Sequence, residues 1–154
     1  MGNPLPEEDQ PVINLLDSHV IDQIAAGEVV ERPASIVKEL IENSVDAGAS
    51  SIQVDIEGGG LGRITVTDDG VGMGAQDLRR CWQRHATSKL LNSSDLFCID
   101  TYGFRGEALS SIASVSELTI TTRRNRDSVG LELKVKGGEL VSESTVACPQ
   151  GTSI

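Results

Sequence analysis

A carboxylate and an amide fall close together on one side of a predicted helix. At about 100° per residue, Glu39, Asn43 and Asp46 share one sector of residues 38–48, and the apolar residues occupy the opposite side. A carboxylate can take a proton from water, and an amide oxygen can help to hold Mg²⁺. The pair therefore suits hydrolysis at a nucleotide site. A solvated helix face is the alternative, and these residues alone leave it open.

A second carboxylate, Asp68, extends the apolar side of a predicted strand. Ile64, Val66 and Asp68 point to one face because side chains alternate along a strand. A buried carboxylate needs hydrogen-bond donors. The exocyclic amine of a purine would serve, and so would backbone amides of the turn at residues 69–72, as in an Asx turn that ends a strand.

Glycines mark two further places where a ligand could approach the backbone. Gly70 and Gly72 follow Asp68, and either form a turn or leave room for a flat ligand. Residues 103–109 open a later helix, where free backbone N–H groups and the helix dipole attract anions such as phosphate. Residues 84–89 add a cation and hydroxyl groups in the preceding loop. A helix start with two flexible glycines is the alternative.

Composition limits the possible classes of protein. The 154 residues suit one domain, and 13 basic against 23 acidic side chains give a formal charge of −10, which repels a nucleic-acid backbone. Three widely spaced cysteines and two histidines favour neither a disulfide framework nor a zinc site. Reduced thiols are typical of a cytosolic or nuclear protein. No apolar run approaches the roughly 20 residues of a membrane span, and we expect no signal peptide.

The helices and strands that must position these groups occur in blocks along the sequence. We expect a disordered leader over residues 1–13, and helices over 17–30, 33–47, 75–85 and 104–114. Two alternating runs around residues 52–56 and 64–66 form a β-hairpin with a glycine turn, and further strands cover 117–123, 129–135 and 139–144. Hairpins demand antiparallel pairing. The pattern predicts an α+β two-layer sandwich.

The chain resembles the amino-terminal ATPase of MutL-type DNA mismatch-repair proteins, over residues from about 13 to the end. The segments that carry this resemblance are residues 23–33 (QIAAGEVVERP), 38–48 (KELIENSVDAG), 84–89 (RHATSK) and 103–109 (GFRGEAL). The last two are highly specific. The resemblance implies the Bergerat fold shared by gyrase B, the heat-shock chaperone and histidine kinases, which is a two-layer sandwich.

The resemblance also implies roles for individual residues. Glu39 would be the general base, Asn43 the magnesium ligand, and Asp68 the adenine reader with Gly70 and Gly72 beside it. Other residues expected to bind ATP are Thr87, Ser88, Lys89, Gly103, Phe104, Arg105, Gly106, Glu107, Ala108, Leu109 and Thr152. The implied cofactors are ATP and Mg²⁺.

The implied function is an ATP-gated switch that links mismatch recognition to strand removal. Its partners would be a MutS-type mismatch-recognition protein, downstream repair enzymes, and DNA through an ATP-dependent dimer. Such a protein works in the bacterial cytoplasm or the eukaryotic nucleus. The alternatives are a nucleotide-binding module without turnover and a topoisomerase or chaperone ATPase of the same fold.

Two departures from the family pattern affect these expectations. The common Asp-Asn-Gly at the adenine motif is Asp68-Asp69-Gly70 here, which adds a negative charge near the site. The chain also stops at Ile154, as the last motif begins its strand. We therefore expect the sheet to lack strands at its C-terminal edge, and hydrolysis by this piece to be weak or absent.

Overall fold

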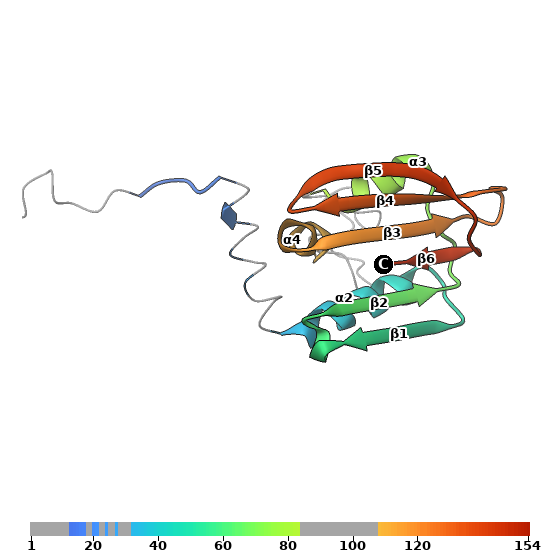
Figure 1. The fold of residues 1–154 in the computed structure, drawn as a ribbon, viewed down its shortest axis with the longest axis horizontal. Coiled ribbons are helices and arrows are strands. Elements are labelled where there is room, and N and C mark those ends of the chain that lie inside the picture. Colours follow the sequence, from blue (N-terminus) through green and yellow to red (C-terminus); the bar gives the residue numbers. More distant parts are fainter. Residues whose placement is uncertain (1–12, 18–19, 22–23, 25–26, 28–31, 84–107) are drawn as a thin grey trace, which may run out of the picture.

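The structure is an antiparallel sheet covered on one face by helices (Figure 1). It is a computed structural model that describes residues 13–17, 20–21, 24, 27, 32–83 and 108–154. The helices are α2 (Pro33–Asp46), α3 (Ala75–Cys81) and α4 (Ala108–Val115), and the strands are β1 (Ile52–Glu57), β2 (Arg63–Asp68), β3 (Glu117–Arg123), β4 (Gly130–Lys136), β5 (Glu139–Val146) and β6 (Gly151–Ser153). The predicted α+β two-layer fold is confirmed.

Helix α2 begins and ends where its sequence predicts. Pro33 is its first residue, a position that needs no backbone N–H donor. Past its end, Gly48 has a positive φ of 71°. The N–H of Gly48 donates to the Val45 carbonyl and that of Ala49 to the Ser44 carbonyl, at 3.0 and 3.1 Å. This is a Schellman cap, and it turns the chain sharply into β1.

The first hairpin keeps the predicted alternation. Register runs from Ile52 opposite Asp68 to Glu57 opposite Arg63 without a slip. A short 3₁₀ turn over Gly58–Gly60 joins the two strands, so the glycine cluster is a turn, as predicted. Because the pairing is regular, Asp68 lies on the same face as Val66, which is buried.

Other boundaries differ from the expectations by a few residues. Helix α3 ends at Cys81 instead of near 85, and Gln83 N–H bonds the Arg80 carbonyl three residues back, which tightens the last turn. Strand β4 lies one residue later than predicted, β5 runs two residues further, and α4 ends at Val115. The predicted start of α4 near 104 and the leader over 1–12 lie outside the described residues.

At the start of the described chain, Asp17 caps a helical segment. Its Oδ1 accepts a hydrogen bond from the Val20 N–H at 2.9 Å, and Val20, Ile21, Ile24 and Gly27 are helical. Asp17, one of the two cap candidates, therefore caps this segment, and Ser18, the other candidate, lies outside the described residues. The predicted end of this helix near residue 30 lies outside the described residues.

The core fills the space between the sheet and the helices. Leu78 of α3, Ile120 of β3 and Leu133 of β4 have no exposed surface and belong to one cluster. A second cluster joins Leu40 of α2, Val66 of β2 and Leu109 of α4. In the part of the chain that the structure describes, no helix is long and apolar enough to cross a membrane.

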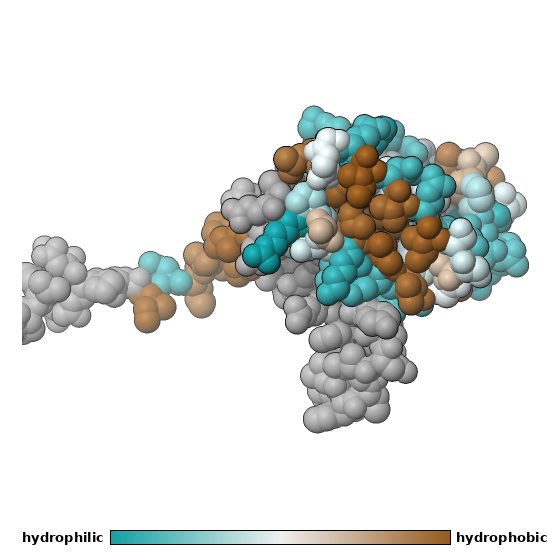
Figure 2. Space-filling view, turned by 90° about the horizontal axis from the view of Figure 1, so that it is seen from below, coloured by the Kyte–Doolittle hydropathy of each residue, from teal (hydrophilic) through white to brown (hydrophobic). Residues whose placement is uncertain are grey.

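The side of the molecule nearest β1 carries apolar surface. Figure 2 views the molecule from this side and shows apolar side chains gathered among polar ones. The exposed apolar side chains of α2, β1 and the following turn include Val45, Ile56 and Leu61. β1 is an edge strand of the described sheet, so side chains near its end are less covered than those of the central strands.

The last strand returns to the middle of the sheet. The strand order is β1-β2-β6-β3-β4-β5, so β6 separates the first hairpin from the rest, and Figure 1 marks the C-terminus between β2 and β3. Thr152 lies opposite Asp68 of β2 and opposite Thr122 of β3. Ile154 extends the pairing through two 2.9 Å hydrogen bonds with Val66.

Candidate functional site

A row of polar residues crosses the centre of the sheet. Asp68, Thr152 and Thr122 are direct neighbours on three adjacent strands, and cross-strand partners share one face. Asp68 follows Ile64 and Val66 in its strand, whereas Thr122 follows Leu118 and Ile120. The inward stripes of β2 and β3 are thus apolar until their last inward residue, which is polar. All three polar residues stand at the same end of the central strands.

Asp68 accepts three hydrogen bonds from the protein. Its Oδ2 accepts from the Ser44 hydroxyl at 2.7 Å, and its Oδ1 accepts from the Gly70 N–H at 2.9 Å and the Thr152 N–H at 3.3 Å. The bond from Gly70 makes the Asx turn that the sequence allows. A carboxylate has about four acceptor positions, so Asp68 retains acceptor capacity for one more donor. The expected dedicated partners are present, and the purine amine stays a prediction.

The turn after Asp68 packs too closely for side chains. At Gly70, a Cβ would stand 2.7 Å from the Ala47 carbonyl oxygen, at the end of α2. Gly72 has a φ of 70°, and a Cβ there would overlap the carbonyl oxygen of Arg123. Both glycines are therefore required by contacts within the protein. The role of the turn as a platform for a flat ligand stays a prediction.

Helix α2 reaches Asp68 through Ser44, a polar residue of its otherwise apolar side. Ser44 is buried, with 3% of its surface exposed, and is the residue that reaches Asp68. Asn43 precedes it directly, and Glu39 lies one turn earlier; both are half-buried. The structure thus places the predicted magnesium ligand next to the residue that contacts Asp68, and the predicted base one turn away along the same helix.

Asp69, the residue that departs from the family pattern, has a local partner. Its Oδ1 accepts hydrogen bonds from the N–H groups of Ser51 and Ser50, at 2.9 and 2.7 Å. These bonds hold the pKa of the Asp69 carboxyl below its usual range, the bond from Ser51 having the larger effect. The extra negative charge is thereby engaged at the start of β1.

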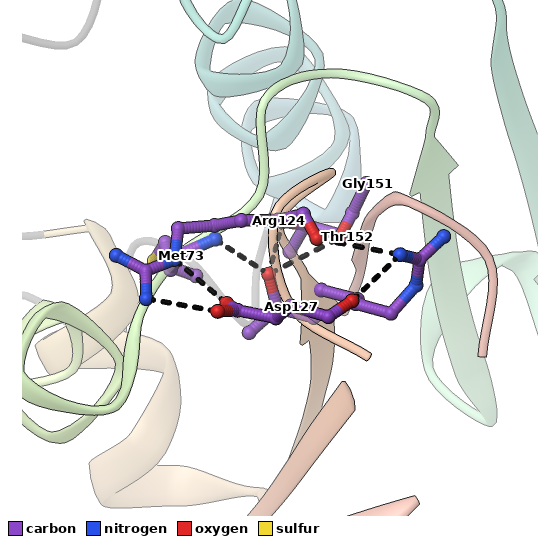
Figure 3. Close-up of polar contacts among 7 residues, drawn as sticks. Met73, Arg124, Asp127, Gly151 and Thr152 are labelled. Atoms are coloured by element: carbon purple, nitrogen blue, oxygen red, sulfur yellow. Dashed lines mark hydrogen bonds and ion pairs between the residues drawn. The ribbon is translucent and has the colours of Figure 1, made fainter. Parts of the chain in front are cut away.

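A hydroxyl of β3, that of Thr122, joins the turn to β6. Thr122 Oγ1 accepts from the Met73 N–H at 2.9 Å and lies 3.1 Å from the Gly151 carbonyl oxygen and 3.0 Å from Thr152 Oγ1. Figure 3 shows Met73, from the turn after β2, converging with Gly151 and Thr152, both from β6. Gly151 has a φ of 123°, and a Cβ there would overlap the Asp68 carbonyl oxygen. Polar bonds and close backbone packing hold the junction together.

The loop between β3 and β4 supports this junction from the side. The Arg123 guanidinium donates to the carbonyls of Cys148, Arg124 and Asp127, at 2.8, 3.3 and 3.0 Å. Arg124 forms a two-bond ion pair with Asp127, which lowers the pKa of that carboxyl (Figure 3). The carbonyl of Arg123 is therefore fixed where Gly72 packs on it.

Several predicted ligand residues cannot be compared with this geometry. Thr87, Ser88, Lys89 and residues 103–107 lie outside the described residues. Ala108 is the first described residue of α4, and the Leu109 side chain is buried against Leu40 and Val66. Leu109 therefore contributes its side chain to the core, and only its backbone is suited to a phosphate cradle.

Ser44 and Thr122 are not identified as site residues by sequence patterns alone. The helical pattern places Ser44 in the apolar stripe of α2, and the strand pattern treats Thr122 as an ordinary strand residue. Both are polar residues at inward positions, with 3% and 1% of their surface exposed. Asp68 is also a polar residue at an inward position, so this kind of placement is the one sequence signal that the three residues share.

The two described cysteines, Cys81 and Cys148, are free thiols. Burial raises the pKa of the Cys81 thiol to about 12, so it stays protonated and unreactive at neutral pH. Neither thiol donates to or accepts from the polar row. Among the described residues, the polar groups of this site are accordingly oxygen and nitrogen groups.

The comparisons with known proteins agree with this arrangement. A family model described as histidine kinase-, DNA gyrase B-, and HSP90-like ATPase matches residues 31–150. The DNA mismatch repair protein MutL of Pelotomaculum thermopropionicum is 56% identical over 142 residues, which are 92% of this chain and 24% of that protein. The chain spans about a quarter of the length of the curated relatives it matches, at 24%, 23% and 22% for three of them.

Two solved structures share the fold. The Aquifex aeolicus MutL ATPase domain complexed with ADP is 30% identical with a TM-score of 0.56, covering 77% of this chain and 39% of that one. The N-terminal domain of a DNA repair protein is also 30% identical, with a TM-score of 0.68, covering 86% of this chain and 37% of that one. The chain therefore belongs to the histidine kinase-, DNA gyrase B- and HSP90-like ATPase family, and within it is similar to MutL ATPase domains.

Proposed function

We propose that this chain binds ATP with its adenine at the polar row and hydrolyses it with Mg²⁺, as the nucleotide-gated part of a DNA mismatch-repair protein. The observation that carries the proposal is Asp68, a carboxylate held by three donors with acceptor capacity left. An acceptor-only group matches the exocyclic amine of adenine. Guanine carries an acceptor oxygen at the same place and is disfavoured.

The groups proposed for hydrolysis lie on α2. Glu39 is half-buried and would take a proton from the attacking water, which is the task of a general base. Asn43 offers an amide oxygen, which suits Mg²⁺ as a ligand. Mg²⁺ usually keeps several of its waters and is bound by a few protein oxygens together with the phosphates of the nucleotide. When bound, Mg²⁺ would neutralise charge on the phosphates. Residues 87–89 and 103–109 would hold those phosphates through hydroxyl, ammonium and backbone N–H groups.

At the level of the whole protein, nucleotide binding would act as a switch. Binding would favour a dimer that passes a signal from a MutS-type mismatch-recognition protein to the enzymes that remove a strand. With a formal charge of −10, this chain is not suited to hold DNA by charge alone. Contacts to DNA would therefore come from the assembled dimer.

Steady-state phosphate release after two substitutions on α2 tests the hydrolytic role. Glu39→Ala should lower turnover by roughly 10² to 10⁴-fold while nucleotide binding stays nearly unchanged, because a general base acts on the barrier and not on the ground state. Asn43→Ala should weaken binding of the magnesium complex instead. Glu42→Ala is the matched control, since Glu42 is on the same helix and pairs with Lys38 at 3.8 Å.

The assay is made on the 154-residue chain and on a form extended past Ile154. Binding of ATP by both forms with phosphate release only by the longer one would assign turnover to groups beyond residue 154 and favour a binding module for this chain. Equal loss of binding in folded Glu39→Ala and Asn43→Ala proteins would contradict the division of roles.

A further inference from the structure

The Thr122 hydroxyl occupies the meeting point of three segments without facing solvent. Only 1% of Thr122 is exposed, and it lies at the end of the inward stripe of β3. Its partners come from the turn after β2 and from β6: the Met73 N–H, the Gly151 carbonyl and the Thr152 hydroxyl. Thr122 is therefore not placed to touch a ligand itself, but it contacts two segments that hold Asp68.

This hydroxyl has a partner for its hydrogen and for at least one of its acceptor positions. A threonine hydroxyl has one hydrogen to donate and two acceptor positions. One acceptor position takes the Met73 N–H, at 2.9 Å. If its hydrogen goes to the Gly151 carbonyl, Thr152 donates to Thr122; if it goes to Thr152, the Gly151 carbonyl loses this partner. In either arrangement, one hydrogen-bonding position of the Thr152 hydroxyl is committed to Thr122.

The two segments bound by Thr122 also supply two of the three donors to Asp68. The Gly70 N–H belongs to the turn that ends at Met73, and the Thr152 N–H belongs to β6. The third donor, the Ser44 hydroxyl, comes from α2 and is independent of Thr122. Removal of the Thr122 hydroxyl would remove one hydrogen-bonded link to the turn and one to β6, the two segments that donate to Oδ1 of Asp68.

We propose that Thr122 is a positioning residue that sets the base selectivity of the nucleotide site. This inference rests on the proposed function, in which Asp68 reads adenine. Thr122 holds the turn and β6 so that Oδ1 of Asp68 stays occupied by protein donors. The remaining acceptor position of the Asp68 carboxylate therefore points in one fixed direction. It also limits how the Thr152 hydroxyl turns. Selectivity for adenine then depends on a residue that does not contact the base.

Thr122→Val and Thr122→Ser separate the hydroxyl from the shape of the side chain. Valine retains the volume and removes the hydrogen bonds, whereas serine retains the hydroxyl. The affinities of the folded chain for ATP and GTP are measured by competition titration with Mg²⁺. We expect Thr122→Val to lower the preference for ATP over GTP by about tenfold, and Thr122→Ser to retain it.

Thr121→Val is the matched control. Thr121 is the preceding residue of the same strand, lies on the opposite face and pairs with Ser153. Its substitution should leave the preference unchanged. A purely structural role for Thr122 would reduce the fraction of folded protein without changing the ratio of the two affinities in the folded fraction.

The outcomes distinguish this inference from the proposed function. If the unaltered protein binds ATP and GTP equally, base reading by Asp68 is wrong. If the unaltered protein prefers ATP and folded Thr122→Val has the same preference, the proposed role of Thr122 is overturned and the function stands. Should Thr122→Val not fold, Thr122→Cys replaces it, because a thiol is a weak hydrogen-bond partner. An unchanged preference in Thr122→Cys would equally overturn the inference.

Discussion

The centre of the sheet and its β4–β5 edge are built from the same alternating pattern but treat polar groups differently. At the centre, Asp68 and Thr122 replace apolar residues at inward positions, and each bonds several backbone groups. At the edge, the inward residues Leu133 and Val135 stay apolar. Polar groups there lie outside the core, as in the ion pair of Arg79 with Glu143, where 58% and 22% of the side chains are exposed.

This difference shows that a polar residue at an inward position of the alternating pattern indicates a role beyond folding. A buried polar group is costly unless it is fully hydrogen-bonded, so a residue of that kind needs a compensating use. An exposed ion pair carries no such cost and is of little consequence for stability. We therefore expect substitutions at the centre to have large effects on folding or binding, and substitutions at the edge to have small ones.

The largest effect is expected from Gly151→Ala. The φ of 123° suits only glycine, and the added Cβ would overlap the Asp68 carbonyl oxygen, which belongs to a paired strand and cannot move freely. Backbone strain and overpacking together should lower the free energy of unfolding by at least about 3 kcal/mol. Urea denaturation followed by circular dichroism measures this change.

Gly58→Ala is the matched control for that experiment. Gly58 also has a positive φ, of 60°, but nothing lies within 4 Å of the place where its Cβ would stand. Only the left-handed backbone is penalised, at roughly 1–2 kcal/mol. Equal destabilisation by the two substitutions would mean that the centre of the sheet is no more tightly packed than an exposed turn.

The smallest effect is expected at the edge, from Arg79→Gln. Arg79 donates three hydrogen bonds to Glu143, at 2.7, 2.9 and 3.1 Å, and these bonds hold the pKa of the Glu143 carboxyl below its ordinary value of 4.5. The stabilisation by the pair is thus present above pH 4.5 and is lost as pH falls below that value. Thermal unfolding at pH 7 and at pH 3 measures it.

The difference in melting temperature between the unaltered chain and Arg79→Gln should be smaller than for Gly58→Ala at pH 7, and should shrink at pH 3 and in high salt. Lys38→Gln, which removes a longer ion pair of 3.8 Å on α2, is the control. A loss as large as that of Gly151→Ala would contradict the contrast between centre and edge.

Much of the fold follows from local signals in the sequence. Pro33 and Gly48 define the ends of α2, and alternation predicts β1, β2 and β3, because each signal reflects the chemistry of a few neighbouring residues. The order of the strands does not follow in this way. Strand β6 has three residues, too few to show alternation, and its place between β2 and β3 depends on pairing across more than 80 positions of sequence, as between Asp68 and Thr152.

The candidate site was predictable in part for the same reason. Asp68 is detectable because a carboxylate interrupts an apolar stripe, and the structure supplies the donors that such a residue requires. Ser44 and Thr122 carry a weaker signal, because serine and threonine are common in helices and strands. Their role depends on which segments meet in space, and local patterns do not contain that information.

The central claim is that Asp68 reads adenine at the polar row, and competition titration of ATP against GTP before and after Asp68→Asn tests it most directly. The substitution suits the fold: Asn accepts the Gly70 and Thr152 N–H groups through its oxygen. Ser44 can redirect its hydrogen to the Leu40 carbonyl, 3.2 Å away, and accept from the new amide. The unaltered chain should prefer ATP by about tenfold or more, and Asp68→Asn should lose that preference. Equal affinities of the unaltered, folded chain for the two nucleotides would contradict the account and leave Asp68 a turn residue.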